Sequence, residues 1–126
     1  MSDDILDCLI IGGGAAGLTA AVYMGRYKRR VLLLDEGHSR LKRIPRTRNV
    51  PGFPDGIEGP ELLHRLQEQA ARYGVTPQAT RVERLRKLDD GNFLAEGRDG
   101  SWRARFVLLA TGASDVEPEI EASRRP

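Results

Sequence analysis

The spacing of apolar residues along the first third of the chain predicts alternating strands and helices. Residues 5–11 and 30–36 are short apolar runs that end at or beside glycine, which is typical of buried strands. Between them, apolar residues recur at helical spacing over about 15–27. A strand, a helix and a second strand within about thirty residues form a βαβ unit, so we expect the two strands to be parallel.

The next segment contains a long loop and a second helix. Residues 37–59 include three prolines and four glycines, which predicts an irregular segment of functional length. Residues 60–73 carry an apolar stripe, with Pro60 suited to the first helical turn and Gly74 to the position after the last. A short third strand is expected at 75–78.

From residue 79 onward, apolar residues recur at every second position and no longer at helical spacing. Polar and apolar residues alternate in three segments, 79–88, 92–97 and 101–106. The pairs Asp90-Gly91 and Asp99-Gly100 separate them, and Asp-Gly between alternating segments is a strong hairpin signal. We therefore expect a three-stranded antiparallel meander. The continuous apolar run 106–110 then predicts a return to a buried parallel strand.

The glycine-rich turn after the first strand is the main chemical signal. In Gly12-x-Gly14-x-x-Gly17, the first glycine permits a tight turn, the second lets a diphosphate approach the backbone, and the third lets helix and strand pack closely. Free N–H groups at the helix start would then bind the phosphates. The candidate cofactor-binding residues here are Gly12, Gly13, Gly14, Ala15, Ala16 and Gly17.

An acidic residue follows at the end of the second strand, about twenty residues later. Asp35 is placed to accept hydrogen bonds from a ribose, and Glu36, one residue on, is the alternative. A carboxylate at this position suits a free 2′-hydroxyl and repels a 2′-phosphate. The sequence therefore favours FAD or NAD over NADP.

Composition adds few constraints. The 126 residues suit one domain, and a net charge of +2 gives no indication of nucleic acid or membrane as a partner. The start of the chain is acidic, unlike a signal peptide, so a cytoplasmic protein is expected. The single cysteine, Cys8, excludes an intramolecular disulfide and is expected to be a buried small hydrophobe.

Basic residues are concentrated before and after the second strand. Nine of them lie between positions 26 and 48, accompanied only by the acids Asp35 and Glu36. They form either a solvated surface or a basic rim that attracts an anionic ligand.

Four segments together resemble a known family. They are GGGAAGLTAAVYMGRY, VLLLDEG, IPRTRNVPGFPDGIEGPELL and LLATGAS. In this order they are similar to the low-molecular-weight, thioredoxin-reductase-like flavoproteins of the pyridine nucleotide-disulfide oxidoreductase group, over nearly all of residues 5–115. The resemblance implies an α/β fold: a Rossmann-like FAD-binding domain over 1–115, with a parallel sheet, helices and an inserted antiparallel meander. Residues 116–126 have no strong pattern and are expected to form a loose tail.

The resemblance also implies roles for residues outside the glycine turn. The first βαβ unit would bind the ADP half of FAD, and the backbone near Val82 would meet the adenine. Asn49 would run beside the flavin, and Ala110, Thr111 and Gly112 would pass close to the cofactor. From the residues alone, Asn49 is equally an ordinary turn residue, and Thr111-Gly112 could simply end a strand.

The chain also departs from the resembled family. The second, NAD(P)H-binding domain, the redox cysteine pair and the returning end of the FAD domain are not found in these residues, and 39–49 replace the usual Gly-Gly-Gln. We therefore expect an FAD-binding portion that is incomplete as an enzyme. The alternatives are a non-catalytic module that binds NAD or ADP-ribose, or a truncated inactive fragment.

The difference from the resembled family also leads to expectations about binding partners. A strand that would lie beside 106–110 is lacking, which predicts an exposed apolar sheet edge that invites pairing with another chain. The expected partners are FAD, a second chain that completes the sheet, a reductase domain, or a second copy in a homodimer.

Overall fold

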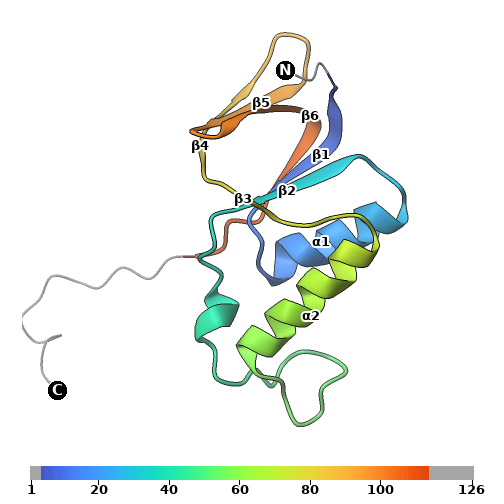
Figure 1. Ribbon diagram of the computed structural model, residues 1–126, viewed down its shortest axis with the longest axis vertical. Coiled ribbons are helices and arrows are strands. Elements are labelled where there is room, and N and C mark those ends of the chain that lie inside the picture. Colours follow the sequence, from blue (N-terminus) through green and yellow to red (C-terminus); the bar gives the residue numbers. More distant parts are fainter. Residues whose placement is uncertain (1–3, 114–126) are drawn as a thin grey trace, which may run out of the picture.

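The computed structural model describes residues 4–113, which form a six-stranded sheet with two helices on one face (Figure 1). The elements in chain order are β1 (Leu6–Ile11), α1 (Ala15–Arg26), β2 (Val31–Asp35), the short 3-10 helix η1 (Arg40–Arg43), α2 (Gly59–Arg72), β3 (Gln78–Ala79), β4 (Val82–Lys87), β5 (Phe93–Gly97) and β6 (Gly100–Leu109). The expected domain end at 115 and tail at 116–126 lie outside the described residues.

The parallel half of the sheet has β1 at its centre. The strand order is β3-β2-β1-β6-β5-β4, and β1 is parallel to both β2 and β6. Ile10 is level with Leu33 on one side and with Leu108 on the other. The carboxyl ends of these three strands therefore meet at one edge, where open α/β sheets bind their ligands. The predicted α/β class, with an antiparallel meander joined to a parallel sheet, is confirmed.

The structure adds a detail to the predicted sheet. The last meander strand and the final parallel strand are one continuous element, β6. Its first half is antiparallel to β5, with Trp102 opposite Ala95, and its second half is parallel to β1. Residues 105–106 contain no turn-forming residue, so the strand continues while its neighbours change.

The third strand also begins later than predicted. Val75 is buried in the helix-side core, and its N–H bonds to the Ala70 carbonyl at 3.0 Å, so it closes the end of α2. Gly74 permits this turn with a φ of +83°. The short strand β3 follows only at Gln78–Ala79, where it pairs with the end of β2.

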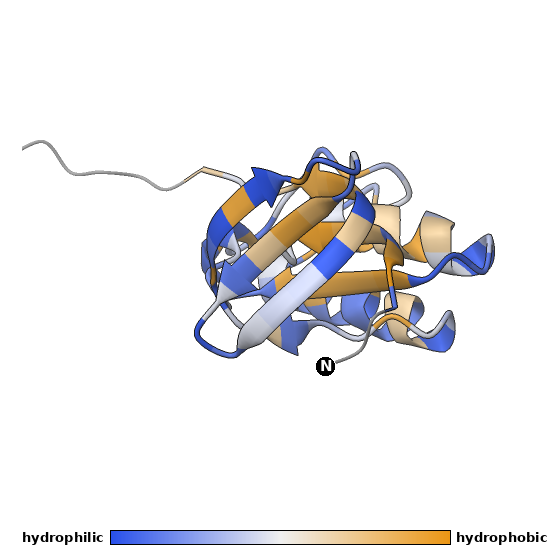
Figure 2. Ribbon diagram, turned by 90° about the horizontal axis from the view of Figure 1, so that it is seen from above, coloured by the Kyte–Doolittle hydropathy of each residue, from blue (hydrophilic) through white to orange (hydrophobic). Residues whose placement is uncertain are grey.

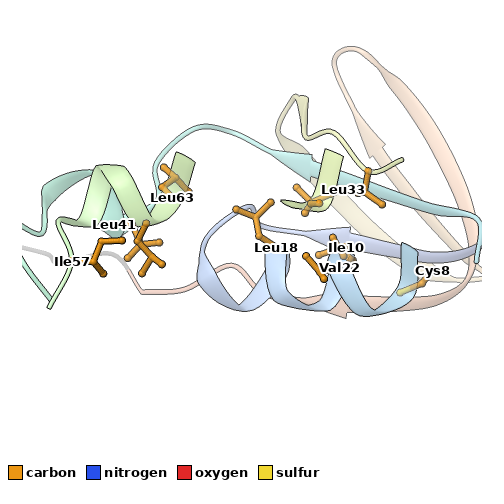
Figure 3. Packing of buried hydrophobic residues seen from close by; sticks show 12 residues of the cluster. Cys8, Ile10, Leu18, Val22, Leu33, Leu41, Ile57 and Leu63 are labelled. Atoms are coloured by element: carbon orange, nitrogen blue, oxygen red, sulfur yellow. The ribbon is translucent and has the colours of Figure 1, made fainter. Parts of the chain in front are cut away.

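The core lies on both faces of the sheet. Between sheet and helices, Cys8, Ile10 and Leu33 meet Leu18 and Val22 of α1 (Figure 3). A continuation of this cluster lies where the loop before α2 packs on that helix, and it contains Leu41, Ile57 and Leu63. The central strands contribute apolar residues to the core on both faces of the sheet. Polar and apolar blocks alternate along the hairpin strands (Figure 2).

The opposite face carries a smaller cluster. Leu9 and Leu34 from the parallel strands pack with Ala95 and Ala104 from the meander, and half-buried Trp102 joins them. The meander therefore curls over the face that the helices leave open. None of the helices in residues 4–113 is long and apolar enough to cross a membrane.

Within residues 4–113, the second half of β6 has a neighbouring strand on one side only. Its described pairing with β5 ends at Ala104, and beyond that residue the strand pairs with β1 alone. Phe106 and Leu109 in this half-strand are 68% and 63% exposed, so the prediction that this run is buried is wrong. The fold thus presents a short apolar strand edge of the kind that pairs readily with another strand.

Candidate functional site

A cleft opens at the carboxyl-terminal edge of the parallel strands. Its volume is about 750 Å³, within the usual range for small-molecule sites. Five segments line it: 11–16 after β1, 34–36 at the end of β2, 38–41 with Ile44, 80–82 before and in β4, and 109–113 at the end of β6. Segments from both ends of the described chain therefore form one site.

The three motif glycines have different surroundings. Gly12 has a φ of +113°, and a Cβ there would overlap the Ala110 carbonyl. A Cβ at the buried Gly17 would overlap the Gly12 carbonyl, so α1 packs directly on the turn. At Gly14, by contrast, the nearest atom to such a Cβ is Ser39 Oγ, 3.3 Å away. Gly12 and Gly17 are needed for the turn, and Gly14 keeps space open in the cleft.

The start of α1 supplies hydrogen-bond donors to the cleft. Gly14 is the N-cap residue and provides no side chain, and the first turn contains no acidic residue. The N–H groups of Ala15, Ala16 and Gly17 precede the first intrahelical bond, which Leu18 N–H makes to the Gly14 carbonyl at 3.0 Å. Ala15 and Ala16 line the cleft. The helix start therefore favours an anion.

Asp35 is held against the glycine turn. Its Oδ1 accepts a hydrogen bond from Gly13 N–H at 3.2 Å, and a Cβ at Gly13 would lie 2.7 Å from Asp35 Cγ. The carboxylate is half-buried and lines the cleft, and it retains acceptor capacity for a second donor.

The neighbouring acid has a different environment. Glu36 is exposed at the cleft wall, and its Oε2 is 3.5 Å from Arg81 Nε. The structure therefore separates the two acids that the sequence left as alternatives: Asp35 lies on the glycine turn, and Glu36 pairs across to the residue before β4.

The entry to β4 is fixed by Thr80, which sequence reasoning missed. Thr80 is 8% exposed; its N–H donates to the Asp35 carbonyl at 3.1 Å and its hydroxyl to Asp99 Oδ2 at 2.7 Å. These bonds place Arg81 and half-buried Val82 at the cleft. No sequence signal marked Thr80 or Arg81, because both appeared as part of an alternating strand.

The end of β6 forms the opposite wall. Ala110 N–H donates to the Ile11 carbonyl at 2.8 Å, which ties this segment to the end of β1. Ala110, Thr111 and Gly112 all line the cleft, and Gly112 has a φ of +70°. These three residues therefore lie with the glycine turn in space, although almost a hundred residues separate them in the chain.

Asn49 is not brought into this cleft. It lies in a shallow depression formed by residues 48–54, and its side-chain Oδ1 accepts a hydrogen bond from Thr47 Oγ1 at 2.7 Å. The surrounding loop is held by the pairing of Thr47 with Ile57 and by Arg65 stacked 5.6 Å over the Phe53 ring. A role for Asn49 beside the flavin stays a prediction.

The loop after β2 supplies cleft residues that were not predicted as site residues. His38, Ser39 and Arg40 line the cleft opposite the glycine turn. The only sequence signal was the excess of basic residues in this stretch, which pointed to an anion-attracting rim without identifying a position.

Other chemistry is not supported by the described residues. Cys8 is 6% exposed, and burial raises the pKa of its thiol, which disfavours the nucleophilic thiolate. Within residues 4–113, no three His, Cys, Asp or Glu side chains are grouped to hold a metal ion.

Sequence comparison places this geometry among known proteins. Residues 6–125 match the family described as pyridine nucleotide-disulphide oxidoreductase. The chain is 34% identical over 115 residues to a thioredoxin reductase of Mycolicibacterium smegmatis, covering 90% of this chain and 37% of that protein. It is 38% identical over 117 residues to a bifunctional thioredoxin reductase/thioredoxin of Mycobacterium leprae, covering 89% of this chain and 25% of that protein.

Solved structures give the same picture. Thioredoxin reductase from Streptococcus pyogenes superposes with a TM-score of 0.85 at 30% identity, over 94% of this chain and 39% of that one. The atypical thioredoxin reductase TRi from Desulfovibrio vulgaris Hildenborough superposes with a TM-score of 0.81 at 35% identity. The match covers 92% of this chain and 39% of that one. The chain thus spans less than two fifths of the length of these relatives. With its glycine turn, strand-end acid and six-stranded sheet, the chain belongs to the pyridine nucleotide-disulphide oxidoreductase family and is thioredoxin reductase-like within it.

Proposed function

We propose that this chain binds FAD through its ADP half and acts as the FAD-binding portion of a thioredoxin reductase-like flavoprotein oxidoreductase. One observation carries the proposal: a single cleft combines the glycine turn, Asp35, the start of β4 and the end of β6. The cleft also fits a diphosphate, because at Gly14 it holds a space that a Cβ would fill. Family membership supports the choice of FAD.

Each wall of the cleft has a proposed role. The N–H groups at the start of α1 bind the diphosphate, Asp35 accepts hydrogen bonds from the adenosine ribose, and the backbone near Val82 meets the adenine. The segment Ala110–Gly112 lies toward the flavin. Bound FAD supplies the electron-transfer chemistry, and the residues of this chain bind and orient it.

Turnover is proposed to need a further component. The only cysteine in the 126 residues is buried, so a dithiol that exchanges electrons with the flavin would come from another segment or chain. The same holds for a site that binds a nicotinamide donor. The proposed reaction, hydride transfer from NAD(P)H through FAD to a disulfide or other acceptor, is therefore that of a larger assembly.

The test is an absorption spectrum of the purified chain followed by titrations with FAD, NAD and ADP-ribose. Flavin bands that co-purify, or saturable FAD binding with a raised melting temperature, support the proposal, because a ligand that binds only the folded state must stabilise it. Binding of NAD or ADP-ribose without FAD would instead support a non-catalytic nucleotide module. Binding of none of the three would refute the site.

Removing the Asp35 carboxylate should weaken FAD binding. In Asp35→Ala the ribose loses a charged acceptor and Gly13 N–H loses its 3.2 Å partner. Hydrogen bonds to charged groups contribute about 1.5–3 kcal/mol each, so we expect roughly a 10- to 100-fold higher Kd for FAD by calorimetric titration. Asp35→Asn retains an oxygen that can accept the hydrogen bond from Gly13 N–H, so it should lose less affinity for FAD than Asp35→Ala. Affinity unchanged in both variants would assign the ribose to Glu36 or refute the orientation.

The exposed half of β6 should mediate self-association, as part of the proposed homodimer. Replacing Phe106 and Leu109 with lysine charges the strand edge, and inward-facing or edge lysines block strand pairing. Sedimentation over a range of concentrations should show dimers for the natural chain and monomers for the double variant. Tyr27→Lys is the control, because Tyr27 is 72% exposed at the end of α1 and lies outside the strand. A concentration-independent natural monomer would contradict the dimer.

A further inference from the structure

We propose that Asp99, in the turn between β5 and β6, is a positioning residue for the adenosine side of the cleft, and that it acts through Thr80. The inference rests on the proposed FAD function and deepens it, because it names a residue outside the cleft that should influence affinity. Asp99 is exposed and does not line the cleft, whereas Thr80 is buried and does.

The segment that contains Thr80 connects strands at opposite edges of the sheet. In the order β3-β2-β1-β6-β5-β4, β3 is the first strand and β4 the last, yet only Thr80 and Arg81 separate them in the chain (Figure 1). A connection of two residues is short, so the sheet curls until its two edges approach each other here. The cleft opens at the same place, since Thr80, Arg81 and Val82 line it.

Thr80 bonds to both halves of the sheet. Its N–H donates to the Asp35 carbonyl at 3.1 Å, at the end of β2, and its hydroxyl donates to Asp99 Oδ2 at 2.7 Å, in the meander. Because Thr80 is only 8% exposed, water has little access to this hydroxyl. A buried hydroxyl without a partner is unfavourable, so the carboxylate of Asp99 helps to determine where the segment lies.

The backbone next to Thr80 is also held by the β5–β6 hairpin. A Cβ at Gly97, the last residue of β5, would overlap the Arg81 carbonyl, so β5 packs directly on this peptide group. The pairing of β4 with β5 then shifts register between Val82 and Arg84, and such irregularities change the direction of a strand. The start of β4 is therefore held by Gly97 and, through Thr80, by Asp99.

The consequence for binding is confined to one side of the cleft. A segment that is held in place before the ligand arrives loses less freedom on binding, which favours affinity. The backbone near Val82 is proposed to meet the adenine, so loosening this segment should weaken binding of the adenosine half of FAD. The diphosphate is proposed to bind at the start of α1, a separate segment of the cleft wall, and its affinity should not change.

The experiment titrates FAD into full 126-residue chains that carry Asp99→Ala, Thr80→Val or both, with adenosine 5′-monophosphate and inorganic pyrophosphate as competitors. Asp90→Ala is the matched control. Asp90 also belongs to an Asp-Gly hairpin turn and accepts hydrogen bonds, from Asn92, but it does not line the cleft. Thr80→Ser keeps the hydroxyl donor, and Asp99→Asn keeps an acceptor oxygen. Thermal melts without ligand set a titration temperature at which every variant is folded.

We expect Asp99→Ala and Thr80→Val each to raise the Kd for FAD and for adenosine 5′-monophosphate about three- to tenfold, because binding must now order a loosened segment. The inhibition constant of pyrophosphate should stay within about twofold, because its site is separate. The double variant should bind FAD about as well as the weaker single variant, because both changes remove the same hydrogen bond. Asp90→Ala, Thr80→Ser and Asp99→Asn should resemble the natural chain.

Three results would overturn the positioning role while the proposed function stands. The first is equal FAD affinity in the natural chain, Asp99→Ala and Thr80→Val. The second is an additive loss in the double variant. The third is an equal loss in Asp90→Ala or for pyrophosphate, because that loss would come from general destabilisation. If the natural chain does not bind FAD, both the positioning role and the proposed function are refuted.

Discussion

Gly14→Val is expected to abolish detectable FAD binding while the protein stays folded. Gly14 has a φ of −87° and ψ of −159°, an extended conformation that valine adopts readily. The new side chain would fill the space between the helix start and Ser39 Oγ, where the diphosphate is proposed to lie. Losing two hydrogen bonds to a charged group costs about 3 kcal/mol or more, so the Kd should rise at least about 100-fold.

The measurement is FAD titration by fluorescence together with a thermal melt of the unliganded protein. Thr19→Val is the matched control, because Thr19 is exposed on the same helix and does not line the cleft. The control should bind FAD normally. A Gly14→Val protein that melts like the natural chain and still binds FAD with natural affinity would remove the diphosphate from this turn.

The largest effect on stability is expected from Gly17→Ala, three residues later in the same motif. Gly17 is buried, and an added Cβ would overlap the Gly12 carbonyl and lie 3.3 Å from Ile10 Cγ2. Alanine favours a helix by about 1 kcal/mol over glycine, but overpacking against backbone costs about 3 kcal/mol and outweighs that gain. We therefore expect a net loss of about 2 kcal/mol.

Thermal unfolding followed by circular dichroism tests this expectation on the protein without ligand. A loss of about 2 kcal/mol corresponds to a melting temperature lower by roughly 8 °C for a domain of this size. Thr19→Ala, an exposed change in the same helix, should shift it far less. If Gly17→Ala melts at or above the natural temperature, the close contact of α1 with the turn is not as tight as the structure indicates.

The two variants separate roles that the motif combines. Both glycines belong to one pattern, yet one should affect binding with little change in stability, and the other stability even without ligand. The difference comes from what a Cβ would meet: mostly open cleft at Gly14, and a backbone carbonyl at Gly17. Double substitution should show near-additive free energies if the two effects are independent, although sites this close can couple.

Local patterns were enough to predict the first βαβ unit and the residues around it. Apolar runs placed β1 and β2 to within a residue, helical spacing placed α1 and α2, and Asp35 was expected at a strand end, where it lies. These features depend on contacts between near neighbours in the chain. Their residue types and spacing therefore carry the information directly.

Period-two alternation was less informative for the sheet's second half. This alternation indicates that a segment is a strand, but it does not predict which strand lies beside it in the sheet. The switch of β6 from β5 to β1 happens inside one continuous strand, at Ala104, without a turn residue to mark it.

By itself the sequence determined the element types, the glycine turn and the acid that follows it, because each depends on local spacing along the chain. Only the tertiary structure decided which distant residues share the cleft. It brought Thr80, Arg81, Ser39 and Arg40 into the cleft that the glycine turn lines, and it left Asn49 in a separate depression. In an irregular loop, apolar residues do not repeat regularly, so the sequence does not indicate which way the side chains point. The position of the loop is determined by long-range packing, here of Leu41 and Ile57 against α2.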